Sequence, residues 1–149
     1  MNGIEIRTAK KQDIPIILGL LYELGRPKPN DVEDESIFEK KIKQYFSDSD
    51  KQILVALLNL EIIGLVSMIF VPRLNRTQLE LYIPELIVRE DFQSHGVGKE
   101  LIKSCIEIGK KKKCHRIRLE SGNQRKVSHK FYLNSGFKQS ALSFTKNLK

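Results

Sequence analysis

Two glycines and a glutamine, spaced as Gln93-x-x-Gly96-x-Gly98, have the types and spacing that could bind a phosphate group. They follow an apolar stretch at residues 85–88 that is typical of a strand, and they precede an amphipathic helix predicted from Val97. Because glycine has no Cβ, a ligand can approach the backbone closely. The first turn of a helix also offers unpaired N–H groups at the positive end of its dipole. This combination binds phosphate, so the turn predicts a ligand that carries phosphate.

Two common phosphate-binding motifs fit this turn poorly. A P-loop needs a glycine where the chain has Gln93 and a Ser or Thr where it has Glu100. A dinucleotide-binding turn needs a third glycine where the chain has Leu101. The dinucleotide-binding motif also needs an acidic residue about 20 residues after its glycines, and Glu120, at the end of the next predicted strand, meets that need. The chain after Glu120 is, however, too short for the further strand–helix units of that fold. The dinucleotide interpretation therefore remains only as a minor alternative.

The elements that must position this turn follow from apolar periodicity and from proline and glycine. Their order, β-α-α-β-β-β-α-β-α-β-β, predicts an α/β fold with a mixed sheet, in a single domain over residues 1–149. Pro84 lies inside one strand and marks a bulge or an edge, because proline cannot donate to a sheet ladder. The predicted strands cover residues 3–8, 52–58, 62–71, 79–88, 115–120, 137–139 and 141–147, and the predicted helices cover residues 14–24, 36–46, 97–112 and 125–134.

A second motif, Phe131-Tyr132 followed by Gly136-Phe137, lies on the last predicted helix and the turn after it. At this separation, the two motifs together resemble those of the GNAT family of N-acetyltransferases, and the resemblance covers nearly the whole chain. It implies a GNAT-like acyl-CoA N-acyltransferase fold, with a mostly antiparallel central sheet and helices on both faces. It also implies an enzyme that moves an acetyl group from acetyl-CoA to a primary amine without a metal.

The resemblance then assigns roles to residues. Glu85, beside the expected distortion at Pro84, is the candidate general base, and Tyr132 is the candidate acid that protonates the departing thiolate. Contacts to the cofactor are implied for Leu86, Ile87, Val88, Gln93, Ser94, His95, Gly96, Val97, Gly98 and Lys99. One position departs from the family pattern, since Arg125 stands where many members have an Asn. Asn123 is the candidate replacement, and the basic side chains of Arg125 and Lys126 could contact the cofactor's 3′-phosphate.

An acidic stretch, residues 31–35, contrasts with the rest of the protein and lies in the region where the family commonly binds its acceptor. It carries Asp31, Glu33, Asp34 and Glu35, which could attract a cationic acceptor such as a polyamine, an aminoglycoside or a lysine side chain. The alternative is a solvated acidic loop, in which Asp and Glu are favoured because a helix starts after it.

The net charge of +8, from 26 Lys and Arg against 18 Asp and Glu, favours anionic partners. Nucleic acid is not expected, because the run Lys110 to Lys113 lacks interleaved aromatic residues. An acetyl-CoA-binding sensor, or a basic nucleic-acid-associated module without turnover, remains the alternative to an enzyme. The longest apolar run, residues 62–71, is too short to span a bilayer. With only two cysteines and no signal-peptide pattern, we expect a cytoplasmic protein, and the resemblance is compatible with a homodimer.

Overall fold

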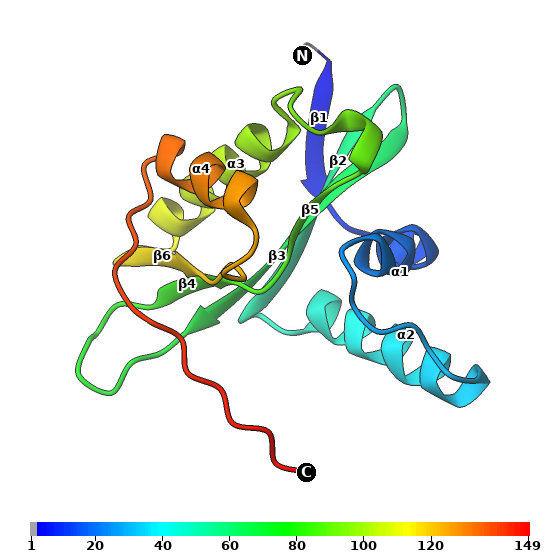
Figure 1. Cartoon of the computed structure of the whole chain (residues 1–149), viewed down its shortest axis with the longest axis horizontal. Helices are drawn as coiled ribbons and strands as arrows, with labels where there is room; N and C mark the ends of the chain where they lie inside the picture. The colour runs from blue at the N-terminus through cyan, green and yellow to red at the C-terminus, as the bar shows by residue number, and fades with distance from the viewer. Residues whose placement is uncertain (1–2) are drawn as a thin grey trace. The chain divides into compact units, whose positions relative to one another are not determined.

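The computed structural model describes residues 3–149, which form two compact units, one ending at Arg118 and the other comprising Leu119–Lys149. The prediction of one domain over residues 1–149 includes two residues outside the described range, and it stays a prediction. Short 3-10 turns lie at Lys11–Asp13 and Glu90–Phe92. The other elements, labelled in Figure 1, are β1 (Ile4–Thr8), α1 (Ile14–Glu23), α2 (Val32–Ser47), β2 (Lys51–Leu58), β3 (Glu61–Val71), β4 (Glu80–Ile83), β5 (Leu86–Val88), α3 (Val97–Lys111), β6 (Arg116–Leu119) and α4 (Lys126–Asn134).

One sheet contains the strands in the order β1-β2-β3-β4-β6, and β5 pairs with β3. β2 is antiparallel to β1 and to β3, and both β4 and β5 are antiparallel to β3. The prediction of an α/β fold with a mostly antiparallel central sheet is therefore confirmed. Since β3 pairs with β2 along one edge, β4 and β5 share its other edge, one after the other.

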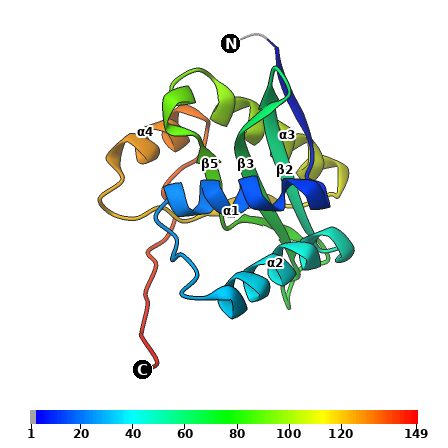
Figure 2. The same cartoon turned by 90° about the vertical axis from the view of Figure 1, so that its right-hand side faces the viewer.

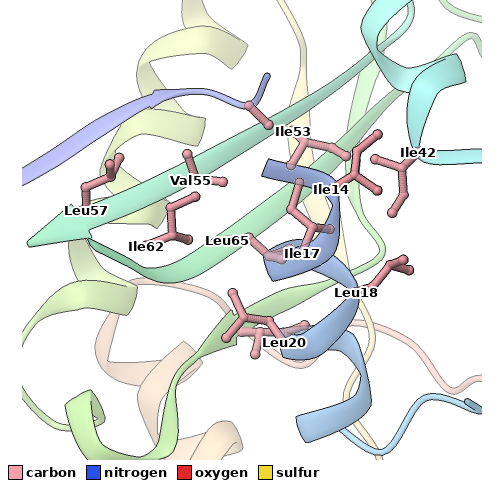
Figure 3. Close-up of a cluster of buried hydrophobic side chains, with 12 residues drawn as sticks. Ile14, Ile17, Leu18, Leu20, Ile42, Ile53, Val55, Leu57, Ile62 and Leu65 are labelled. Carbon is pink, nitrogen blue, oxygen red and sulfur yellow. The ribbon is translucent and has the colours of Figure 1, made fainter. Parts of the chain in front are cut away.

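The face of the sheet under α1 and α2 holds a continuous apolar core (Figures 2 and 3). Figure 3 shows side chains of α1 directed at strand residues, with Ile14 and Ile17 near Ile53 and Leu65. Burying each such side chain contributes about 1.5–3 kcal/mol, so this core fixes α1 against the strands. The cluster consists of Ala9, Ile14, Ile17, Leu18, Leu20, Ile42, Ile53, Val55, Leu57, Ile62, Leu65 and Ile87.

The opposite face of the sheet is covered by α3 (Figure 1). Val97, Leu101 and Cys105 repeat at helical spacing and are at most 1% exposed. Burial raises the pKa of the Cys105 thiol to about 12, which keeps this side chain an uncharged core residue at neutral pH. Helices on both faces of the sheet are therefore present within the first unit alone.

A buried glutamate helps to hold the outer strands together. Glu80 on β4 is fully buried and accepts hydrogen bonds from Nε of Arg116, at 2.9 Å, and from Nε of Arg118, at 2.6 Å. Burial alone would raise the pKa of this carboxyl, but the two guanidinium groups outweigh burial and hold its pKa below the ordinary value. The Arg118 guanidinium also lies 4.5 Å from the centre of the Tyr82 ring.

Two sequence expectations are wrong at the ends of elements. α2 begins at Val32 rather than residue 36, because the Asp31 carboxylate accepts the Asp34 N–H at 2.8 Å and caps the helix there. Residues 137–149, all described, contain no strand, although two strands were predicted at 137–139 and 141–147. Leu142 and Phe144 are 74% and 88% exposed, so the apolar positions of this segment have no core to enter.

Candidate active site

A bulge separates β4 from β5 at Pro84 and Glu85, as the proline predicted. Tyr82 pairs with Ile69, and Leu86 pairs with Val66. The chain therefore takes four residue steps from Tyr82 to Leu86 but only three from Ile69 to Val66 on β3. The extra residue breaks the ladder and changes the direction of the strand. Glu85 therefore lies where the regular pairing with β3 is interrupted between β4 and β5.

Ser67 on β3 holds Glu85 at this bulge through three hydrogen bonds. The Ser67 N–H donates to the Glu85 carbonyl oxygen at 2.9 Å, and the Glu85 N–H donates to Ser67 Oγ at 3.1 Å. The Ser67 hydroxyl also donates to Oε2 of the Glu85 side chain. Ser67 is 3% exposed, whereas the Glu85 side chain is 24% exposed. The carboxyl group is thus oriented by a buried partner while part of it reaches the surface.

Two further side chains of the first unit lie near the Glu85 carboxyl. Nη2 of Arg26 is 3.9 Å from Glu85 Oε1 and donates to the Pro84 carbonyl oxygen at 3.2 Å. Tyr45 on α2 has its pKa raised to about 12, first by burial and then by the charge of Glu85. The Tyr45 phenol consequently keeps its proton at neutral pH, and the Glu85 carboxyl has the Ser67 hydroxyl as a hydrogen-bond donor and the Arg26 guanidinium as a nearby positive charge.

The predicted phosphate-binding turn lies after β5 and the short 3-10 turn Glu90–Phe92, and its backbone conformation suits its glycine. Gly96 has a φ of 85° and Ser94 a φ of 64°, both in the left-handed region. The Gln93 side chain donates to the Val88 carbonyl oxygen at 3.1 Å, and Nδ1 of His95 lies 2.8 Å from the Gln93 carbonyl oxygen. The side chains of Gln93 and His95 therefore stabilise the turn itself.

The start of α3 leaves several backbone donors without a helical partner. Gly96 is the N-cap and supplies no side-chain cap, and the first helical bond runs from the Glu100 N–H to the Gly96 carbonyl oxygen at 3.1 Å. The N–H groups of Val97, Gly98 and Lys99 precede that bond. Lys99 is exposed beside them. This end of the helix can therefore accept an anion.

Gly64, which the sequence analysis did not single out, lets three parts of the site approach one another. A Cβ at this position on β3 would lie 2.9 Å from the Ile87 carbonyl oxygen and 3.3 Å from Val97 Cγ1. Any side chain would push β5 or the start of α3 away. Gly64 and Ser67 interrupt an otherwise apolar strand, and this interruption was the sequence feature that could have identified them as site residues. Both contact the candidate site.

The second unit carries the other predicted residues. Tyr132 on α4 makes edge-to-face contacts with Phe131 and Phe137, with ring centres 5.3 and 5.8 Å apart. Gly136, with a φ of 91°, ends α4 as predicted and lets the Phe137 N–H bond the Tyr132 carbonyl oxygen at 3.0 Å. Burial raises the pKa of the Tyr132 phenol, and the charge of Arg125 opposes that shift. Tyr132 is therefore protonated at neutral pH, as a proton donor must be.

Asn123 and Arg125 are both exposed in the segment before α4, and Arg125 is its N-cap without a side-chain cap. The Arg125 N–H donates to the Gly122 carbonyl oxygen at 3.0 Å, and Nε2 of His129 lies 2.7 Å from the same oxygen. The structure thus places Glu85 and residues 86–99 in the first unit, and Asn123, Arg125 and Tyr132 in the second. The cofactor contacts implied for Asn123 and Arg125 stay predictions.

The acidic stretch forms the first turn of α2 and has a local role. Asp31 caps the helix, and Asp34 accepts the Asn30 N–H at 3.0 Å. Glu33 and Glu35 are exposed. Attraction of a cationic acceptor by this turn stays a prediction. Within residues 3–149, no three His, Cys, Asp or Glu side chains gather as metal ligands would, and no described helix combines the length and apolarity needed to cross a membrane.

Comparison with known proteins gives consistent matches. A model of the acetyltransferase (GNAT) family matches residues 18–137. The chain is 27% identical to an aminoalkylphosphonate N-acetyltransferase from Salmonella typhimurium over 148 residues, 99% of this chain and 94% of that protein. A solved structure of glucosamine-6-phosphate N-acetyltransferase from Arabidopsis thaliana is similar in fold, with a TM-score of 0.82, 20% identity and coverage of 98% and 99%. AAC(6')-Iy in complex with the bisubstrate analog CoA-S-monomethyl-acetylneamine has a TM-score of 0.84, with 17% identity and 98% of each chain covered.

Proposed function

Because the chain belongs to the GNAT family of acetyltransferases, we propose that it moves an acetyl group from acetyl-CoA to a primary amine within one ternary complex. The acceptor is the amine of a small cationic molecule, of a lysine side chain or of an N-terminus. The relative from Salmonella typhimurium is an aminoalkylphosphonate N-acetyltransferase, which adds aminoalkylphosphonates to the acceptors to be tested. The observation that supports the proposal most is the position of Glu85, held by Ser67 at a bulge immediately before β5.

The cofactor contacts follow from the segment after Glu85. One edge of β5 pairs with β3, so its other edge can pair with the amide arm of acetyl-CoA, as an added strand would. Leu86, Ile87 and Val88 supply those backbone groups, and one of their N–H groups polarises the thioester carbonyl. The pyrophosphate binds the N–H groups at the start of α3, with Lys99 as a nearby positive charge.

The reaction requires a neutral amine, which is scarce at neutral pH. An alkylammonium has a pKa near 10.4, so about one molecule in a thousand or fewer is neutral at pH 7. Glu85 takes the ammonium proton, directly or through water, and the amine nitrogen attacks the thioester carbon. The C–N bond forms, a tetrahedral oxyanion develops, and the C–S bond then breaks. Tyr132 gives its proton to the departing thiolate, and the nitrogen of the intermediate, which still carries an extra proton, returns one to the Tyr132 phenolate through water. Free CoA and the N-acetylated amine then leave, and Glu85 releases its proton to solvent.

A thiol-release assay over a panel of amines tests this function. The panel contains a polyamine, an aminoglycoside, a lysine peptide and an aminoalkylphosphonate. Acetyl-CoA consumption above the hydrolysis background, with the acetylated amine identified by mass spectrometry, is expected. Tight acetyl-CoA binding measured by calorimetry without turnover on any amine would instead identify a sensor, and absence of binding would refute the cofactor as well.

Glu85→Gln tests the base with pH as the variable. Turnover should fall at neutral pH and recover toward wild type above about pH 10, where the amine loses its proton unaided. Glu107→Gln, an exposed carboxylate on α3, is the matched control and should leave the profile unchanged. An equal loss at every pH would remove Glu85 as the base. Tyr132→Phe, which deletes only the hydroxyl, should lower turnover with little change in the KM for acetyl-CoA.

A further inference from the structure

The end of α1 places a guanidinium group beside the Glu85 carboxyl. Gly25 has a φ of 93°, its N–H donates to the Tyr22 carbonyl oxygen at 3.0 Å, and the Arg26 N–H donates to the Leu21 carbonyl oxygen at 3.1 Å. These two bonds form the glycine-dependent helix end known as a Schellman motif. The backbone of Arg26 is therefore fixed by the helix rather than left in a flexible loop.

The Arg26 side chain reaches the bulge, and its guanidinium has more N–H groups than its bond to the bulge uses. Its Nη2 group bonds the Pro84 carbonyl oxygen at 3.2 Å and lies 3.9 Å from Glu85 Oε1. The side chain is 50% exposed, and a guanidinium carries five N–H donors in a fixed planar fork. That fork matches two oxygens of one phosphonate, phosphate or carboxylate group.

A guanidinium so close to the proposed base is unfavourable for an ordinary cationic acceptor. An ammonium that approaches Glu85 also approaches Arg26, and like charges at this range repel. If the acceptor also carries an anionic group near its amine, the Arg26 guanidinium attracts that group and offsets the repulsion of the ammonium. An amine and an anionic group separated by one or two carbons would place the amine at Glu85 and the anion at Arg26.

We propose that Arg26 binds an anionic group of the acceptor, so that the substrate class is a short amine bearing a phosphonate, phosphate or carboxylate. This inference rests on the proposed acetyl transfer and favours an acceptor with an anionic group over the purely cationic acceptors of that proposal. Arg26 is the specificity residue, and Glu85 keeps its role as the base.

The test compares amines that differ in the anionic group alone. Wild type should acetylate 2-aminoethylphosphonate with a kcat/KM at least about tenfold above that for propylamine, which has a similar chain without the charge. β-Alanine distinguishes a carboxylate from a phosphonate. A wild-type preference for propylamine or for a polyamine would overturn the inference while leaving acetyl transfer intact.

Arg26→Gln removes the charge but keeps an N–H₂ donor that can still bond the Pro84 carbonyl oxygen. It should lower kcat/KM for 2-aminoethylphosphonate about ten- to a hundredfold and leave that for propylamine unchanged or raised. Arg26→Lys should retain part of the preference, since the charge remains without the fork. The control Lys28→Gln removes an exposed charge two residues away and should change neither value. Equal losses with both amines would mean that Arg26 only supports the bulge.

A binding measurement keeps this inference separate from turnover. Methylphosphonate, which has no amine, should bind wild type in a calorimetric titration and should bind Arg26→Gln at least about tenfold more weakly. If no amine is acetylated, the proposed function fails, and this titration still decides whether Arg26 binds an anion. Equal affinity of the two proteins for methylphosphonate would overturn the assignment.

Discussion

Ser67→Ala should reduce catalysis through Glu85, because this one hydroxyl bonds both the backbone and the side chain of that residue. Ser67 Oγ accepts the Glu85 N–H at 3.1 Å and donates to the Glu85 carboxyl. Alanine removes both bonds and keeps the strand-to-strand bond from the residue 67 N–H to the Glu85 carbonyl oxygen. The backbone of the bulge should therefore persist, while the carboxyl loses its buried partner.

The magnitude follows from the two lost bonds. A hydrogen bond to a charged group contributes about 1.5–3 kcal/mol, and a partly buried N–H left without an acceptor adds a cost of similar size. Because partial solvent access at Glu85 softens both losses, we expect the free energy of unfolding to fall by about 2–3 kcal/mol. A carboxyl group free to move by an ångström should lower kcat/KM for the amine about 10- to 100-fold.

The assay is a double-mutant cycle with Glu85→Gln, measured by thiol release at pH 7 to 10. If Ser67 acts by orienting Glu85, Ser67→Ala should change kcat/KM by no more than about twofold once Glu85 is already Gln. The KM for acetyl-CoA should stay near the wild-type value in all four proteins. Ser47→Ala, which removes an exposed hydroxyl on α2 bonded to a backbone carbonyl, is the matched control.

If the fold-losses in kcat/KM of the two single variants multiply in the double variant, Ser67 acts independently of the base, and its role in orienting Glu85 is refuted. A large rise in the KM for acetyl-CoA in Ser67→Ala would also contradict it, since that result would indicate a displaced β5 rather than a mobile carboxyl group. Urea unfolding of the four proteins separates lost stability from lost orientation, because turnover can be compared where each protein is fully folded.

Two further predictions concern the framework of the site. Gly64→Ala should weaken acetyl-CoA binding at least about tenfold, because the new Cβ would meet the Ile87 carbonyl oxygen at 2.9 Å; unchanged affinity by calorimetry would show that β5 can yield. Asp13→Asn should lower the free energy of unfolding at pH 7 by about 1–3 kcal/mol, because Arg7 loses its charged partner at 2.7 Å. The pKa of Asp13 is lowered chiefly by the Arg7 hydrogen bond, so its contribution is present above the unfolded pKa near 3.9 and lost as the pH falls through the folded value. Urea unfolding from pH 7 to 3 should show the two proteins converging in acid, and a constant difference would contradict the prediction.

Local features of the chain were predictable because they depend on residues close in sequence. The glycine at Gly96 takes the left-handed conformation that begins α3, and Gly136 takes the same conformation at the end of α4. Pro84 marks a bulge because it lacks an N–H group. Each of these features depends on the stereochemistry of one residue type, and the helix end at Gly136 and the interruption at Pro84 were expected from the sequence.

The sequence predictions were wrong where a local pattern of residue types fitted more than one structure. The segment after Gly136 alternates as a strand does, yet a strand forms only when it has both a pairing edge and a face to bury. The start of α2 was placed too late because acidic residues were interpreted as a loop, whereas Asp31 caps the helix. In both places, a pattern of residue types admitted two structures, and the contacts of the folded chain selected one.

By itself, the sequence determined the glycine turn at residues 93–98, the end of α4 and the interrupted strand beside Glu85, because short-range spacing sets backbone conformation. Only the tertiary structure decided which side chains meet at that glutamate. Ser67 reaches it through the register of β3. Arg26 reaches it because α1 packs on the sheet and the chain that follows α1 brings the guanidinium to the Pro84 carbonyl oxygen. Sheet register and helix packing depend on the whole apolar core, so contacts between residues distant in sequence cannot be obtained from local spacing.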